Sequence, residues 1–220
     1  MATIVESTAT VETLADLLHE LGDIPPARIR LRPPPGTATE KDVETAEARG
    51  LLCELVDGVL VEKPMGFLES RLANLLIHFI EAFLERYDLG VTAGEAGTLK
   101  LAEGLVRIPD VSFVCWEQLP GGELPTEAIP RLFPDLAVEI LSKSNTRREM
   151  LRKMREYFTA GTRLVWLVDP KTRTAEIYTS VDQCIKLDEN GTLDGGDVLP
   201  GFRLRLGEWL DRVRRRTAAD

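Results

Sequence analysis

The sequence predicts an α/β (α+β) fold: a mixed β-sheet flanked by helices, with a short helical arm at the N-terminus. The strongest helical pattern covers 67–87, where apolar residues recur at helical spacing and build a broad apolar face. The stretch 133–141, FPDLAVEIL, alternates apolar residues in the manner of a strand. A second helical pattern, 145–160, separates it from the strand patterns 163–168 and 175–179. Strands and helices that alternate in this way are typical of a sheet covered by helices.

Residues 133–141 are expected to form the central strand of that sheet. Leu136, Val138 and Ile140 fall on one face of the strand, and Glu139 falls on the other. Glu139 also has an apolar residue on each side. A buried carboxylate loses its hydration unless a cation or hydrogen-bond donors compensate for it. We therefore expect the rest of the chain to bring such partners to Glu139.

The first 50 residues are predicted to form a helical arm with a proline-rich connector, and 51–220 the main domain. The arm begins with a helix over 9–21, which ends at Gly22. The connector 24–36 is rich in proline, which favours an extended backbone. A second short helix is expected to open at 37–40, where the residues have the spacing of a capping box. Such an arm can bind a partner or act as a lid, but packing over the domain edge is the interpretation we favour.

Shorter strands complete the predicted domain. Two alternating runs joined by Asp57-Gly58 predict a β-hairpin over 51–62. Glu54 lies on its first strand, and the pattern does not decide whether it faces solvent. The run Arg107–Val114 is expected to lead into another strand, with Pro109 as its first residue and Asp110 at its entrance. Further strand patterns cover 91–93, 98–101 and 184–187, and a terminal segment covers 204–213.

The composition excludes several classes of chemistry. The chain has two histidines, His19 and His78, and both fall in helical patterns. Its three cysteines, Cys53, Cys115 and Cys184, lie far apart without a C-x-x-C motif. These counts argue against Ser-His-Asp triads, zinc sites and a disulfide framework. Any catalysis is therefore expected to use carboxylates, lysines and a metal ion that prefers oxygen ligands.

Charge and hydropathy indicate an ordinary globular protein. Hydrophobic residues make up 44% of the chain and charged residues 29%. No apolar run approaches the roughly 20 residues that span a bilayer, and the N-terminus lacks a secretory signal pattern. We therefore expect a cytoplasmic protein without a membrane partner. The net charge of −9 argues against a basic field over the whole surface, and leaves open a local basic groove for nucleic acid.

Four residues make up the candidate catalytic set: Asp110, Glu139, Lys153 and Glu69. Asp110 and Glu139 lie on predicted strands, Lys153 borders the core-facing side of the following helix, and Glu69 lies beside the apolar face of 67–87. Carboxylates that hold Mg²⁺, with a lysine nearby, are what metal-assisted hydrolysis of a phosphodiester requires. The simpler alternatives are acids that form turns or cap helices, a Glu69 that interacts with the helix dipole, and a structural Glu139–Lys153 pair.

At these residues the sequence resembles a known family. The motifs RIPDVSFV, FPDLAVEILS and LVWLVDP are similar to those of the Uma-two family of restriction endonucleases, a branch of the PD-(D/E)XK nuclease superfamily. The motifs CELVDGVLVEKPMG and GGDVLPGF support the match, which covers roughly 51–209. The resemblance implies a restriction-endonuclease-like core. It also implies that Asp110, Glu139 and Glu69 are ligands of Mg²⁺ or Mn²⁺, with Glu69 as the helix acid found in many members.

The catalytic lysine departs from the superfamily pattern. An E-x-K motif would place it at 141, where this chain has Leu141. The resemblance implies that the family takes the lysine from the next helix, which gives Lys153. Lys143, at the end of the same strand, is the rival candidate.

Two functions are compatible with these features. The first is a metal-dependent endonuclease that hydrolyses DNA, and because both strands of a duplex must be cut we expect a homodimer. The second is a catalytically inactive nuclease-fold protein that binds or oligomerises, which the acidic charge and Leu141 favour. A basic groove leading to the acids would favour the first, and a purely acidic cleft the second. The basic residues that would line such a groove are Arg107, Lys143, Arg147, Arg148 and Lys153.

Overall fold

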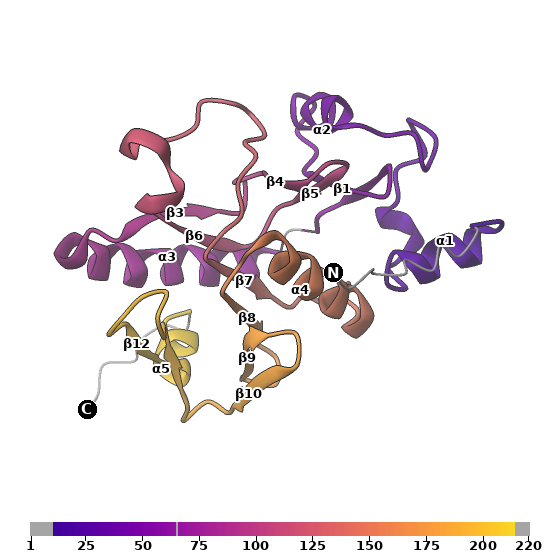
Figure 1. Cartoon of the computed structure of the whole chain (residues 1–220). Coiled ribbons are helices and arrows are strands. Elements are labelled where there is room, and N and C mark those ends of the chain that lie inside the picture. Colours follow the sequence, from indigo (N-terminus) through magenta and orange to yellow (C-terminus); the bar gives the residue numbers. More distant parts are fainter. Residues whose placement is uncertain (1–10, 65, 214–220) are drawn as a thin grey trace.

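A six-stranded mixed sheet forms the centre of the molecule (Figure 1). The computed structural model describes residues 11–64 and 66–213. The strand order is β10-β9-β8-β7-β6-β3, in which β7 and β8 run parallel and the other neighbours run antiparallel. The strands are β3 (Gly90–Gly94), β6 (Val111–Cys115), β7 (Leu136–Ile140), β8 (Leu164–Asp169), β9 (Thr174–Ser180) and β10 (Gln183–Leu187). The expected central strand is therefore confirmed as β7.

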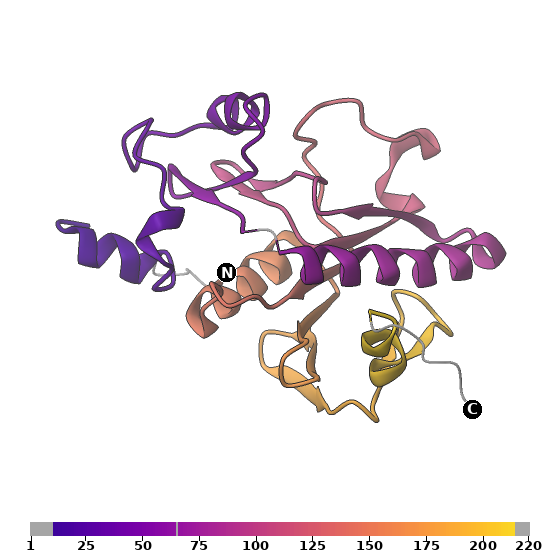
Figure 2. The same cartoon turned by 180° about the vertical axis from the view of Figure 1, so that it is seen from behind.

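The two faces of β7 pack against different helices, as the alternation predicted. Leu136, Val138 and Ile140 belong to the core shared with α3 (Phe67–Tyr87) and α5 (Leu206–Asp211). Figure 2 shows α3 running along this face of the sheet. Ala137 instead packs with residues of α4 (Arg147–Ala160) on the opposite face. Because side chains alternate along a strand, Glu139 also points toward α4.

Helix α4 connects the parallel strands β7 and β8 and starts where the sequence predicted. Thr146 caps its N-terminus by accepting a hydrogen bond from the Glu149 N–H, and the Glu149 side chain completes a capping box. The helix ends at Gly161, whose φ of 117° suits a residue without a side chain. Lys153 and Tyr157 are four residues apart, so both face the sheet.

A smaller four-stranded sheet packs beside the large one, in the order β2-β1-β5-β4. Its members are β1 (Cys53–Val56), β2 (Val59–Glu62), β4 (Leu99–Ala102) and β5 (Leu105–Arg107). The predicted hairpin is confirmed: Asp57 and Gly58 both have positive φ, as a tight turn between β1 and β2 requires. The expectation that Pro109 begins the next strand is wrong: β6 begins at Val111, and Arg107 ends β5 in this other sheet. Pro109 and Asp110 cross between the two sheets.

The N-terminal arm packs over the small sheet. It contains α1 (Leu14–Glu20), the 3₁₀ helix η1 (Pro26–Arg28) and α2 (Glu40–Glu47). Leu21, Ile24 and Ile29 bury themselves against β1 and β2, while α2 covers the opposite face. Helix α2 opens within the expected stretch 37–40, but its capping box consists of Thr39 and Asp42 and not of Thr37 and Glu40. The predicted helix 9–21 is shorter: α1 begins at Leu14 after its N-cap Thr13, and residues 9 and 10 lie outside the described residues.

The C-terminal region adds a small hairpin that sequence patterns did not predict. Strands β11 (Thr192–Asp194) and β12 (Arg203–Arg205) pair ahead of α5. Two 3₁₀ helices, η2 (Trp116–Gln118) and η3 (Pro120–Gly122), shape the loop before β7. Across the part of the chain that is described, no helix combines the length and apolar character needed to cross a membrane.

Candidate functional site

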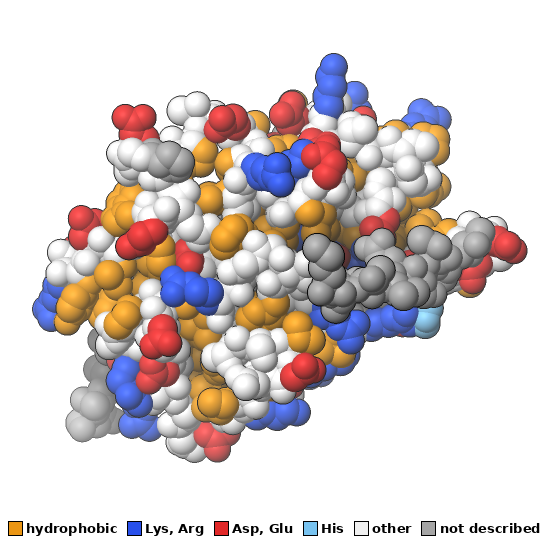
Figure 3. Space-filling model, in the orientation of Figure 1, with side chains coloured by type: hydrophobic (Ala, Val, Ile, Leu, Met, Phe, Trp, Pro, Cys, Tyr) orange, Lys and Arg blue, Asp and Glu red, His pale blue; other side chains and the backbone are white. Residues whose placement is uncertain are grey.

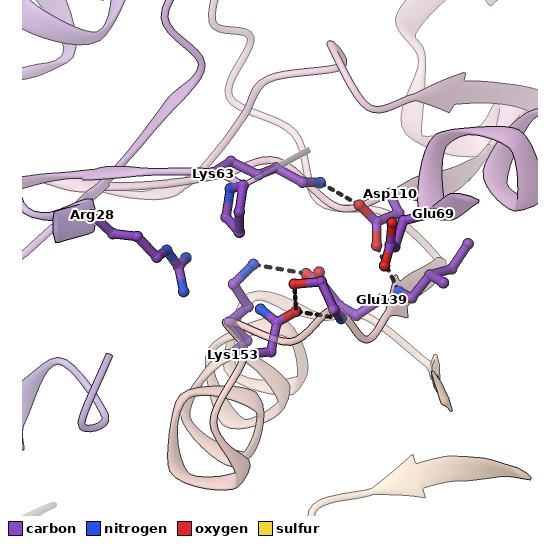
Figure 4. Close-up of a pocket in the computed structure, with 10 residues that line it drawn as sticks. Arg28, Lys63, Glu69, Asp110, Glu139 and Lys153 are labelled. Atoms are coloured by element: carbon purple, nitrogen blue, oxygen red, sulfur yellow. Dashed lines mark hydrogen bonds and ion pairs between the residues drawn. The ribbon is translucent and has the colours of Figure 1, made fainter. Parts of the chain in front are cut away.

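A pocket opens where the two sheets, α3 and the start of α4 meet (Figure 4). All four residues of the predicted set line it. Three carboxylic acid side chains and three basic side chains line it. The lining residues are Arg28, Lys63, Pro64, Glu69, Asp110, Glu139, Ile140, Ser142, Asn145 and Lys153.

Asp110 joins the start of β6 to β7. Its backbone N–H donates to the Val138 carbonyl at 3.0 Å, and its Oδ2 accepts a hydrogen bond from the Ile140 N–H at 2.6 Å. Its other oxygen, Oδ1, lies 2.8 Å from Nζ of Lys63. These contacts fix a largely buried carboxylate beside the strand that carries Glu139.

Glu139 projects from β7 toward α4, where two donors converge on one of its oxygens. Its Oε1 accepts a hydrogen bond from the Tyr157 hydroxyl at 2.7 Å and one from Nζ of Lys153 at 3.1 Å. Burial raises the pKa of Glu139, and the positive charges of Lys153 and Lys63 oppose that shift. Burial also raises the pKa of Tyr157 well above its ordinary value, so Tyr157 remains a neutral donor.

Lys153 bridges two carboxylates in the interior. Its Nζ lies 2.9 Å from Glu54 and 3.1 Å from Glu139, and the residue is only 2% exposed. Burial acts to lower the pKa of Lys153, but the charges of Glu139 and Glu54 together outweigh it and raise the pKa. Lys153 is therefore a permanent cation in the site.

Glu54, which the sequence pattern left undecided, is fully buried behind Lys153. Besides Lys153 it pairs with Arg107 at 2.8 Å and accepts a hydrogen bond from the Ile108 N–H. Burial opposes ionisation of Glu54, but the charges of Lys153 and Arg107 together lower its pKa. Arg107 in turn donates to Glu156 at 2.7 Å. The ion pairs that link Glu54, Arg107 and Glu156 therefore fix the position of Lys153 on the side away from the pocket.

We expect Glu54→Gln to destabilise the protein by roughly 3 kcal/mol at pH 7, because the change leaves buried cations without their carboxylate. The folded-state pKa of Glu54 is lowered, so its stabilising contribution is present above about pH 4.5 and fades as the pH falls below that value. Urea unfolding of both proteins at pH 7 and pH 4 measures the difference, which should shrink at the lower pH. The exposed Glu44→Gln serves as the control, with a change within about 0.5 kcal/mol.

Sequence reasoning missed two cationic residues of the pocket, Lys63 and Arg28. Lys63 follows β2 and continues the alternation of Val59 and Val61, which could have marked it as inward-facing. Arg28 lies in the proline-rich connector, which has no helical or strand periodicity from which the direction of its side chain could be predicted. It makes a two-pronged pair with Glu149, at 2.7 and 3.0 Å, and also donates to the Glu62 carbonyl. The arm therefore contributes directly to the pocket wall.

The five basic residues that would form a groove leading to the acids do not gather at the pocket. Of the five, only Lys153 lines the pocket. Arg107 is buried in the ion-pair chain, Arg147 pairs with Glu176, and Lys143 is exposed at the end of β7. On the face shown in Figure 3, Lys and Arg side chains gather along one lower edge and are mixed with acids elsewhere.

Comparison with known proteins gives the family. The sequence model of the Uma2 family, described as "Putative restriction endonuclease", matches residues 41–207, most of the chain. The chain belongs to the Uma2 family. No curated protein matches it. Among solved structures, it is similar to a "putative nuclease belonging to DUF820" from Anabaena variabilis ATCC 29413, with a TM-score of 0.65 and 20% identity over 73% of this chain and 92% of that one. This similarity confirms a nuclease-like fold.

The acids of this Uma2 protein suit a metal site with few protein ligands. Within residues 11–64 and 66–213, no three Asp, Glu, His or Cys side chains are arranged to hold a metal ion. Glu69, half-buried in the first turn of α3, lines the pocket but is not part of such a group. Mg²⁺ usually keeps several waters and binds through one or two carboxylates together with substrate phosphates. Asp110 and Glu139, as neighbouring carboxylates at a pocket, fit that mode of binding.

Proposed function

We propose that this Uma2 protein is a metal-dependent endonuclease that hydrolyses phosphodiester bonds of DNA. The observation that carries the proposal is the convergence of Asp110, Glu139 and Lys153 on one pocket. Two carboxylates on adjacent strands with a fixed lysine are the groups that such hydrolysis uses. The family description supports DNA as the substrate.

In this proposal Asp110 and Glu139 hold Mg²⁺ or Mn²⁺, and Glu69 is the further acid at the pocket rim. Among the described residues Oε2 of Glu139 has no hydrogen-bond partner, which leaves it free to bind a metal ion. The bound ion would polarise the phosphate and activate the attacking water. Lys153 supplies a fixed positive charge that stabilises the negative charge of the transition state. Tyr157 and Lys153 together hold Glu139 in place by their bonds to Oε1.

The proposal is tested by incubating the purified protein with supercoiled plasmid in Mg²⁺ or Mn²⁺. We expect conversion to open-circular and linear DNA, and no conversion when EDTA is present. Parallel reactions with single-stranded DNA and RNA identify the preferred substrate. Failure to cut any of these polymers in either metal would contradict the endonuclease proposal.

A nuclease-fold protein that binds or oligomerises without cutting is the second candidate, and one observation favours it. Leu141, at the position of the usual lysine, packs with the apolar cluster beneath α4, so no cation approaches Glu139 along β7. This candidate predicts DNA binding in a gel-shift assay that is insensitive to EDTA, with no cleavage.

We also propose that the protein is a homodimer, because cutting both strands of a duplex is easier with two sites. Light scattering coupled to size-exclusion chromatography is expected to give twice the mass of 24.5 kDa. A monomer at micromolar concentration, with or without DNA, would contradict this part of the proposal.

A further inference from the structure

We infer that the Lys63 ammonium takes the place of the metal ion when no divalent ion is bound. It pairs with the metal-binding oxygen of Asp110, and a divalent ion that binds this oxygen displaces it. The inference rests on the proposed function, since it concerns the same metal site. It assigns a role to a residue outside the Asp110, Glu139 and Lys153 set.

The two oxygens of Asp110 differ in what holds them. Oδ2 accepts the Ile140 N–H at 2.6 Å, and that donor is part of the β7 backbone and cannot move away without disturbing the strand. Oδ1 is held by Nζ of Lys63 at 2.8 Å, a donor at the end of a flexible side chain. Oδ1 is therefore the oxygen that an incoming metal ion can take, and Lys63 is the group that occupies its place.

Lys63 forms fewer ion pairs than Lys153, the other lysine of the pocket. Lys153 is held between two carboxylates, Glu54 and Glu139. Lys63 forms one ion pair, with Asp110, and its other direct contact is the neutral carbonyl of Ile108. Of the two ammonium groups, Lys63 therefore costs less to displace.

Repulsion makes a displacement necessary. Nζ of Lys63 lies 2.8 Å from Oδ1 of Asp110, where the incoming ion would bind. A divalent ion on Asp110 Oδ1 would lie next to the Lys63 ammonium, in a buried region where repulsion between like charges is weakly screened. Metal binding to the wild type therefore includes the cost of moving Lys63, and a variant without this ammonium avoids that cost.

The test is calorimetric titration of the full chain with Mn²⁺ alone. Lys63→Met and Lys63→Gln remove the charge but keep much of the side-chain volume. Lys41→Met removes an exposed charge on α2, away from the pocket, and is the matched control. We expect both Lys63 variants to bind Mn²⁺ about tenfold more tightly than the wild type, and Lys41→Met to bind like the wild type.

Thermal unfolding provides a readout independent of activity. Without metal the Lys63 variants should melt below the wild type, because Asp110 loses its buried partner. Saturating Mn²⁺ should raise their melting temperature by more than it raises that of the wild type. If Lys63→Met does not fold without metal, the wild type is compared with Lys63→Gln, whose amide can still donate a hydrogen bond to Asp110.

The outcomes separate this inference from the proposed metal site. If the wild type binds Mn²⁺ as tightly as both Lys63 variants, or more tightly, the proposed role of Lys63 is wrong. The proposed metal site is not affected by that result. Absence of binding in the wild type and in both variants would overturn the inference and the metal site together. Binding by the variants alone would support the inference in its strongest form.

Discussion

Replacing Lys153 by Met is expected to abolish plasmid nicking and to destabilise the fold by roughly 3–5 kcal/mol. Both effects have the same cause. Lys153 is the cation between Glu54 and Glu139, so its removal leaves two buried carboxylates facing each other with reduced compensation. Urea unfolding measures the loss of stability, and nicking is assayed at a temperature where the variant is still folded.

Lys143→Met is the matched comparison for this prediction. Lys143 is exposed at the end of β7 and does not line the pocket, so its replacement is expected to leave stability and nicking near the wild-type level. This pair of variants decides which lysine serves the reaction. Loss of nicking in Lys143→Met, with activity kept in a folded Lys153→Met, would assign the role to Lys143 instead.

Glu139→Gln is expected to slow nicking by roughly 10³-fold, since metal-ion stabilisation of the transition state contributes several kcal/mol and each 1.36 kcal/mol is a factor of ten. The fold should survive. Tyr157 can still donate to the amide oxygen, and Lys153 keeps its pair with Glu54. The rate is measured from the disappearance of supercoiled plasmid at saturating Mg²⁺.

Glu81→Gln is a suitable control for the loss of one negative charge, because Glu81 lies on the exposed side of α3 and bonds Thr92. It should nick at the wild-type rate. A Glu139→Gln protein that cuts as fast as this control would remove Glu139 from the proposed metal site.

The parts of the fold that the sequence predicted are those with strong local patterns. The apolar alternation of 133–141 identified β7 and the direction of Glu139, and helical spacing gave α3 and α4 with their ends. From the direction of Glu139 and the following helix, Lys153 could be placed opposite it. Local patterns were sufficient here because these partners lie on consecutive elements of a β-α unit.

The rest of the site depends on contacts between residues far apart in the sequence. Arg28 and Glu149 are 121 residues apart, and nothing in the proline-rich connector indicates that it reaches the pocket. Lys63 meets Asp110 only because Arg107 ends β5 in one sheet and Val111 begins β6 in the other. Whether a basic groove leads to the acids could not be predicted for the same reason: Arg107 faces Glu54, a partner that the sequence alone could not assign.

The most direct test of the central claim is calorimetric titration of the wild type and Asp110→Asn with Mn²⁺. Asp110→Asn keeps the shape of the side chain and can keep the bond from the Ile140 N–H, but it removes the charge that would bind the metal. We expect the wild type to bind Mn²⁺ and Asp110→Asn not to bind it. Equal binding by the two proteins would contradict a metal site at Asp110, and so would the absence of binding in the wild type and in both Lys63 variants.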